Sequence, residues 1–293
     1  MIVLAFDDRR VGDAWFFRAG ETWHAYVLTC PLDVQPHVWW DITHATSRDL
    51  KAWHVHGEIT HSQHEPAELA GCVATGSVIE HGLGGRRYLM AHTLRHAGPD
   101  PAVVLRTSDD LHDWHLVGDG PALSLSDDAA GMYEQVGSGS RAVPHFRDPF
   151  LFEWNGELHF IVCATRPGRA RGGTVAAARW TGERWQLLPP PEMPDVCEEL
   201  ECPQVHRIDD GDWRLVFSSF GHFFNPAAAN RSGVYCFRGP TPLGPWHDLR
   251  PLQVDKMHAG QLLRDGERWL LVGTNFSGFG SLTDPIDVTD RLV

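Results

Sequence analysis

Residues 145–160 read HFRDPFLFEWNGELHF, and this stretch contains the pattern that decides the fold. Asn155-Gly156 is a frequent two-residue turn of β-hairpins, and apolar runs stand on both sides of it. Asp148 and Pro149 begin the first run, where a proline is tolerated mainly in an edge strand. The stretch therefore predicts a β-hairpin whose first strand lies at the edge of a sheet.

Related hairpins recur along the chain, each with an apolar run, a glycine turn and a second β-rich run. The first runs are DAWFFRA (13–19), TGSVIEHG (75–82), RDPFLFEW (147–154), ECPQVHRI (201–208) and HAGQLLRD (258–265). The turn glycines are Gly20, Gly85, Gly156, Gly211 and Gly266. Their spacing is close to the length of a four-stranded propeller blade. We therefore expect an all-β, five-bladed β-propeller that forms one domain over residues 1–293, with a β-sandwich as the alternative.

A second internal match supports the repeat. The segments SRDLKAW (47–53) and SDDLHDW (108–114) share the form S-x-D-L-x-x-W. Trp185 and Trp246 are expected to play the part of its tryptophan in the third and fourth units. The 29 glycines, 20 prolines and 12 tryptophans of the chain also favour short strands and turns over long helices.

Composition and charge exclude several classes of function. The chain has 293 residues, of which 42% are hydrophobic, so it can bury a full core. Its net charge of −13 disfavours nucleic acid and anionic membranes as partners. The six cysteines form no CxxC pair and are expected to be free thiols, and the N-terminus lacks the features of a signal peptide. These features predict a cytoplasmic protein.

Polar and charged residues mark the strand starts of the repeat. Counting back from the turn glycines, similar places hold Asp13, Ser77, Asp148, Glu201 and His258. An aspartate or glutamate at a strand end is usually a turn residue or a solvated one. Three carboxylates that converge on one channel, however, repel one another, and this raises the pKa of some of them. Such a split provides one carboxyl acid and one ionised carboxylate, the pair that glycoside cleavage requires.

The motifs that carry these residues are similar to those of a known enzyme family. They are RDP (147–149), ECP (201–203), TGS (75–77), HATSRDLKAW (44–53) and GETWHAYVL (20–28). On these motifs the chain resembles glycoside hydrolase family 32, the fructan- and sucrose-cleaving propeller enzymes. That family shares its propeller with families 43 and 68. The chain lacks the C-terminal β-sandwich usual in family 32, so the resemblance implies a stand-alone propeller that acts on a small carbohydrate.

The resemblance also implies roles for individual residues. Glu201 would be the general acid/base, and Asp148 would bond sugar hydroxyls and stabilise the transition state, with Arg147 balancing the charge. Asp13 would be the nucleophile, although its GDAWFF surroundings differ from the N-D-P-N-G form of the family. The ECP triplet implies a retaining fructofuranosidase-like reaction. An inverting arabinosidase- or xylosidase-like reaction and a non-catalytic sugar-binding propeller are the alternatives.

Further side chains are candidates for contact with the sugar. The set comprises Trp15, Trp39, Trp40, His44, Ser77 and His258. Aromatic rings stack on sugar faces, but twelve tryptophans exceed the need of one pocket, so core packing is the commoner role for each. Histidine and serine can donate hydrogen bonds to sugar hydroxyls.

No cofactor and no catalytic metal are expected, and an ion in the channel near His258 is left open. The densest histidine clusters are HVH (54–56) and HSQHE (61–65). Two histidines of HVH share one strand face, but no third ligand is near in sequence, and zinc-protease motifs are absent.

Overall fold

Antiparallel hairpins build the chain, and their tight turns depend on the five glycines of the repeat. The computed structural model describes residues 4–34, 40–60, 71–96, 100–137, 144–169, 171–225, 231–275 and 280–292. The five turn glycines have φ between 59° and 80°, a left-handed conformation that other residues rarely adopt. The glycine pattern that predicted the turns therefore has a direct conformational reason.

The strands form five antiparallel sheets, which we call blades 1 to 5 in chain order. They are β1 (Arg9–Ala19), β2 (Thr22–Pro31), β3 (Asp41–Ser47) and β4 (His54–Glu58) in blade 1; β5 (Gly71–Glu80), β6 (Tyr88–His96), β7 (Ala102–Ser108), β8 (His115–Leu116) and β9 (Leu123–Ser124) in blade 2; β10 (Phe146–Trp154), β11 (Glu157–Thr165), β12 (Gly173–Trp180) and β13 (Trp185–Leu187) in blade 3; β14 (Glu201–Asp209), β15 (Asp212–Ser219), β16 (Gly233–Gly239) and β17 (His247–Val254) in blade 4; and β18 (Met257–Asp265), β19 (Arg268–Asn275) and β20 (Ile286–Asp287) in blade 5. Short 3₁₀ turns lie at Leu83–Gly85, Leu125–Asp127, Gly221–Phe223 and Thr289–Arg291.

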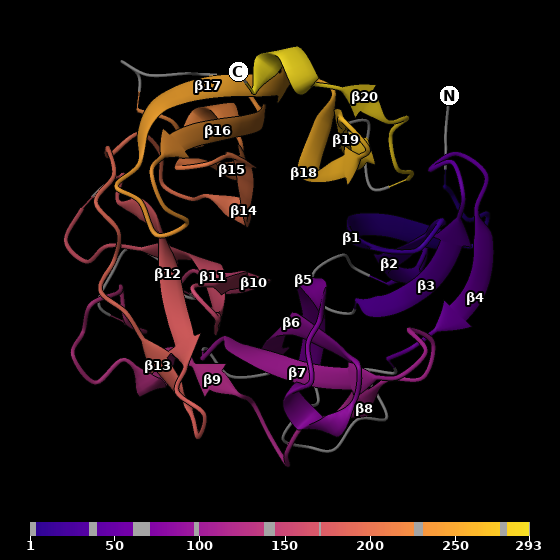
Figure 1. Cartoon of the computed structure of the whole chain (residues 1–293), viewed down its shortest axis with the longest axis horizontal. Helices are drawn as coiled ribbons and strands as arrows, with labels where there is room; N and C mark the ends of the chain where they lie inside the picture. Colours follow the sequence, from indigo (N-terminus) through magenta and orange to yellow (C-terminus); the bar gives the residue numbers. More distant parts are fainter. Residues whose placement is uncertain are drawn as a thin grey trace.

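The blades are arranged around a central axis, as a propeller requires. Figure 1 shows β1, β5, β10, β14 and β18 around the centre, with β4, β8, β13 and β17 at the outside. The predicted five-bladed, all-β propeller in one domain is confirmed. The first strand of each predicted hairpin is the inner strand of its blade, so residues at the starts of these strands come together.

The ring closes between blade 5 and the N-terminal segment. The backbone N–H of Leu282 donates to the carbonyl of Leu4 at 3.0 Å. Thr274 of β19 donates through Oγ1 to the Gly12 carbonyl of β1 at 2.8 Å. Arg18 and Asp265 add an exposed ion pair at 2.9 Å between the same two blades. Backbone pairing and a buried hydroxyl, rather than this surface pair, therefore join the first and last blades.

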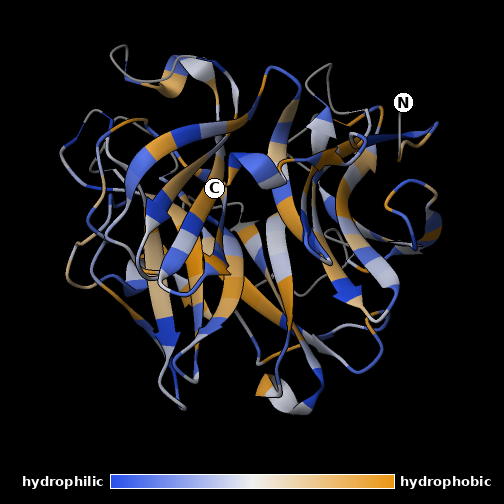
Figure 2. Ribbon diagram, turned by 45° about the horizontal axis from the view of Figure 1, so that its top comes forward, coloured by the Kyte–Doolittle hydropathy of each residue, from blue (hydrophilic) through white to orange (hydrophobic). Residues whose placement is uncertain are grey.

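The core consists of apolar layers between successive blades, because each sheet buries both faces against its neighbours. Figure 2 shows hydrophobic residues concentrated on the strands. The repeat tryptophans lie in these layers: Trp114 packs between blades 1 and 2, Trp185 between blades 2 and 3, and Trp246 between blades 3 and 4. Trp185 and Trp246 thus occupy places like that of Trp114, as the repeat predicts.

The buried thiols and the absence of long helices agree with the sequence. All six cysteines are free and buried. Within the described part of the chain, no helix has the length and apolar character needed to cross a membrane.

Candidate active site

A β-bulge near the start of every inner strand shapes the candidate site. The pairing register shifts between Val11 and Ala14, Ala74 and Gly76, Arg147 and Phe150, Glu201 and Gln204, and His258 and Gln261. A bulge bends its strand and redirects the side chains beside it, and bulges are frequent next to active sites. The candidate residues Asp13, Asp148, Glu201 and His258 lie in or directly beside these bulges.

Arg147 of β10 connects three carboxylates. Its Nη2 lies 2.7 Å from Oε1 of Glu201 and 3.0 Å from Oε2 of Glu199. Its Nε lies 3.5 Å from Oδ2 of Asp148. The guanidinium is buried, so it offsets acidic charge in a place that water screens poorly. This agrees with the charge-balancing role that the resemblance implies.

Two histidines also contact these carboxylates. Nε2 of His258 lies 2.8 Å from Oε2 of Glu201, and Nε2 of His145 lies 3.1 Å from Oε2 of Glu199. Glu201 therefore stands between Arg147 and a histidine from the next blade. Residues from blades 3, 4 and 5 thus meet at one point of the ring.

Asp13 joins the same group through Cys202. Oδ2 of Asp13 accepts a hydrogen bond from Thr75 Oγ1 at 2.9 Å and lies 3.9 Å from Cys202 Sγ. The backbone N–H of Cys202 donates to Oδ2 of Asp148 at 3.2 Å. Asp13 and Asp148 thus contact the same residue, and that residue follows Glu201 in sequence. The structure therefore brings the three predicted carboxylates together.

The backbone at the two central bulges is strained. Asp148 has φ 63° and Cys202 has φ 49°, in the left-handed region that residues other than glycine rarely adopt. The N–H of Asp148 donates to Thr93 Oγ1 at 2.7 Å, which holds the bulge of β10 against β6. The bulge conformation and this hydrogen bond together set the direction of the Asp148 carboxyl relative to the neighbouring blade.

The pKa values of the acidic groups are split, as expected of converging carboxylates. Burial raises the pKa of Asp148 to about 6, and the charges of Asp13 and Glu201 add to this although Arg147 opposes it. Burial would also raise the pKa of Glu201, but His258 and Arg147 hold it well below its usual range. Burial would lower the pKa of His258, yet Glu201 raises it to about 9. In the ligand-free protein the proton of the Glu201–His258 pair therefore lies on the histidine, and the carboxyl with a raised pKa is Asp148.

Exposure separates the roles of the three carboxylates. Asp148 is buried, whereas Asp13 and Glu201 are partly exposed. A ligand in the channel can therefore reach Asp13 and Glu201 directly. Cys202 is buried, and burial together with the nearby carboxylates raises its thiol pKa well above the usual range. A neutral buried thiol is a poor nucleophile, which leaves the carboxylates as the candidate reactive groups.

Three predicted substrate contacts lie in the core of blade 1. Trp15 and Trp40 are 1% and 3% exposed in the layer between blades 1 and 2, so neither offers a face to a sugar. His44 is buried on β3 and stacks on the ring of Tyr26. These three are core residues of blade 1, which corrects the prediction that they bind substrate.

Ser77 holds a neighbouring strand in place. Its Oγ donates to the Pro149 carbonyl at 2.9 Å and accepts from the Leu151 N–H at 2.8 Å. The hydroxyl is buried and makes both of these bonds to β10, so we correct its predicted contact with substrate. Trp39 lies outside the described residues.

Sequence reasoning missed Glu199, His145 and Thr75. Glu199 precedes Glu201 by two residues, and alternate residues of an extended chain point to the same side, so the run EELE carried a weak signal. Thr75 belongs to the TGS motif, in which Ser77 is the predicted substrate contact. Nothing in the sequence places His145 beside Glu199.

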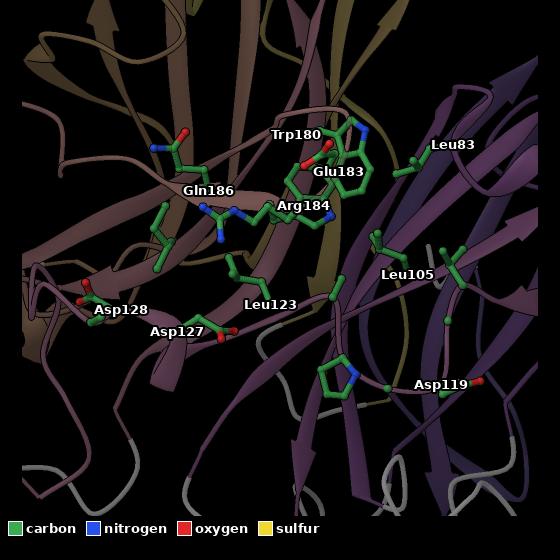
Figure 3. Close-up of a pocket in the computed structure, with 18 of the residues that line it drawn as sticks. Leu83, Leu105, Asp119, Leu123, Asp127, Asp128, Trp180, Glu183, Arg184 and Gln186 are labelled. Carbon is green, nitrogen blue, oxygen red and sulfur yellow. The ribbon is translucent and has the colours of Figure 1, made fainter.

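A separate cavity of about 690 Å³ opens between blades 2 and 3. Figure 3 shows its apolar side chains, among them Leu83, Leu105 and Trp180, with Asp127 and Arg184 nearby. None of the predicted site residues lines it. The candidate site is placed instead where carboxylates from three blades meet, because this cavity contains none of them.

Comparison with known proteins identifies the fold. No protein-family model and no curated protein matches the chain. Solved structures do match. An inulosucrase from Halalkalicoccus jeotgali bound to kestose has a TM-score of 0.72 at 21% identity, over 94% of this chain and 79% of that chain. A levansucrase variant from B. subtilis has a TM-score of 0.70 at 11% identity, over 98% of this chain and 85% of that chain. A fructofuranosidase from Schwanniomyces occidentalis complexed with fructose has a TM-score of 0.71 at 14% identity, over 97% of this chain and 58% of that chain.

At these identities the matches establish the architecture. The expected resemblance to the propellers of fructan- and sucrose-acting enzymes is confirmed at the level of the fold. The chain has the five-bladed propeller seen in levansucrase, inulosucrase and β-fructofuranosidase structures.

Proposed function

We propose that the protein is a glycosidase that cleaves or transfers a fructofuranosyl-like unit of a small oligosaccharide. One observation carries the proposal: Asp13, Asp148 and Glu201, from three blades, meet around Cys202 and Arg147. Two of the three carboxylates are partly exposed, and the pKa values of the group are split. A sugar-binding propeller without catalysis needs no such arrangement.

In the proposed reaction Asp13 attacks the anomeric carbon while the leaving oxygen takes a proton from the Glu201–His258 pair. His258 holds that proton in the free protein, 2.8 Å from Glu201, and can return it to the carboxylate as negative charge develops on the leaving group. The resulting glycosyl-enzyme then reacts with water or with a sugar hydroxyl, whose proton Glu201 accepts. Asp148, buried beside these two carboxylates, offsets positive charge at the anomeric carbon. This retaining course is the one that the resemblance implies.

The names of the fold's relatives suggest the first substrates to test. These relatives include an inulosucrase bound to kestose and a levansucrase complexed with sucrose. Sucrose, kestose and an aryl fructofuranoside should be offered to the purified protein, with products followed by mass spectrometry. Aryl arabinofuranosides and xylosides test the family 43-like alternative.

Variants connect the activity to the site. Glu201→Gln should slow sucrose cleavage by about 10²–10⁴-fold, because the alcohol leaving group needs a proton. Its rate on an aryl substrate with a good leaving group should fall far less, whereas Asp13→Asn should lose activity on both. Glu198→Gln is the matched control, since Glu198 pairs with Arg171 at 2.9 Å outside the carboxylate group. Near-normal sucrose cleavage by Glu201→Gln would refute the acid/base assignment.

A sugar-binding propeller is the second candidate. The altered surroundings of Asp13, GDAWFF in place of N-D-P-N-G, favour it. Calorimetric binding of kestose without turnover of any substrate offered would support this candidate over the enzyme.

A further inference from the structure

Five histidines gather where blade 1 meets blade 2, away from the inner strand starts that carry the carboxylates. We call them the histidine cluster: His24 on β2, His44 on β3, His54 and His56 on β4, and His112 in the loop after β7. The HVH motif supplies two of them. The third ligand that the sequence did not reveal comes from blade 2, because the fold places the loop after β7 against blade 1.

Three members of the cluster have the spacing of a metal site. One ring nitrogen of each of His44, His56 and His112 lies within 4.8 Å of the other two. The centroids of the His44 and His56 rings are 4.8 Å apart, and each lies 4.7 Å from that of His112. With Zn–N bonds of 2.0–2.1 Å, tetrahedral ligands are about 3.3 Å apart. His56 and His112 are exposed, so small rotations of their side chains close this gap.

His44 presents a buried nitrogen that has no protein partner. The residue is 1% exposed, and its Nδ1 makes no hydrogen bond. Its Nε2 lies 3.0 Å from Nδ1 of His24. When Nε2–H of His44 donates to His24, the lone pair of His44 Nδ1 is left free for a ligand. An unpaired buried polar atom is costly, and a metal ion would satisfy it.

The other two ligands also have supporting contacts. Nε2 of His56 is 2.8 Å from Thr46 Oγ1, which leaves Nδ1 for the ion and orients the ring. Such partners of metal-bound histidines fix both ring orientation and tautomer. The backbone N–H of His112 donates to Asp110 Oδ1 at 2.8 Å, so a side chain of the same loop restrains the backbone that carries the His112 ring.

The loop that carries His112 is docked on blade 1. Tyr26 OH donates to the Leu111 carbonyl at 2.9 Å, and the ring of Trp114 packs edge-on against Tyr26. The same S-x-D-L-x-x-W motif in blade 1 carries Lys51 where blade 2 carries His112. The histidine is therefore not part of the shared structural motif, and its ring lies against those of His24, His44 and His56.

We propose that His44, His56 and His112 bind one divalent transition-metal ion. Three imidazoles with an open, solvent-facing position suit Zn²⁺, with water as the fourth ligand. The ion would join β3 and β4 of blade 1 to the loop of blade 2. It would therefore stabilise the boundary between these blades and take no part in the chemistry at the carboxylates.

Calorimetry with ZnCl₂ on full-length, EDTA-treated and dialysed protein tests the site. We expect one ion per chain with micromolar or tighter affinity. His112→Asn and His56→Asn, both at exposed positions, should each weaken binding at least about tenfold, since each removes one of three ligands. His247→Asn, at an exposed histidine of blade 4, is the matched control and should bind like the wild type. Circular dichroism of each variant confirms that it is folded.

Two further readouts make the outcome decisive. Co²⁺ should give the visible absorption of a four-coordinate nitrogen-rich site in the wild type, and His112→Asn should lose it. Zn²⁺ should raise the melting temperature of the wild type and leave that of His112→Asn unchanged. Absence of one-to-one binding would overturn the proposal. So would affinity that is equal in the wild type and both ligand variants, because the ions would then be held by other histidines.

Discussion

Replacing His258 by glutamine should remove the pH dependence that the His258–Glu201 pair gives to the stability of the fold. Burial acts to lower the pKa of His258, but Glu201, 2.8 Å away, raises it from 6.5 to about 9. This difference corresponds to about 3 kcal/mol of preference for the protonated ring in the folded state. The folded pKa lies above the unfolded one. The contribution is therefore fully present below pH 6.5 and is lost as the pH rises through 9.

Urea unfolding at about pH 6 and about pH 10 measures this contribution. Between these values, the free energy of unfolding of the wild type should fall by about 3 kcal/mol more than that of His258→Gln. Glu201→Gln should lose most of the same pH dependence, because the uncharged amide no longer favours the imidazolium. His247→Gln is the control and should follow the wild type. Equal pH slopes in the wild type and His258→Gln would refute the inference that the two side chains form a buried ion pair.

Two further predictions concern packing and the blade boundary. Gly76→Ala should destabilise the fold by about 3 kcal/mol, because the added Cβ would lie 2.1 Å from the Ala91 carbonyl oxygen. Gly120→Ala, where nothing lies within 4 Å, should be nearly neutral in the same urea titration. Tyr26→Phe should cost about 1–2 kcal/mol, because it leaves the Leu111 carbonyl without its hydroxyl donor. An unchanged urea midpoint in Tyr26→Phe would show that this hydrogen bond does not hold the loop on blade 1.

The fold was predictable because short sequence patterns mark each copy of its repeat. Gly20, Gly156 and Gly266 adopt a left-handed conformation that few other residues tolerate, so the chain marks each inner hairpin at a fixed place. Trp114 and Trp185 mark the layers between blades in the same way, since each fills the space beside the preceding sheet. These patterns span only a few residues each, so they can be recognised without knowing which residues are neighbours in the structure.

The substrate contacts predicted on blade 1 were less accessible to sequence reasoning. Trp15 and His44 lie on strands of the blade that carries Asp13. The direction of a side chain depends on strand register and bulges, which the sequence does not specify. The proposed role of His112 as a metal ligand could not be predicted from the sequence for a different reason. Its partners His44 and His56 lie in another blade. A ligand set assembled across a blade boundary leaves no short motif.

Strand register also changes the interpretation of the charged residues. Counting from the turn glycines aligns Asp148 with Glu201 and His258, but Gly156 is the second residue of its turn and Gly266 the first. A register shift between Arg207 and Asp209 further lengthens the count in blade 4. The last paired residues before the bulges are Arg147, Glu201 and His258. Equivalent positions of three successive inner strands therefore hold cation, anion and cation. This order explains why the pKa of Glu201 falls, whereas Asp148, one residue further along its bulge and buried, keeps a raised pKa.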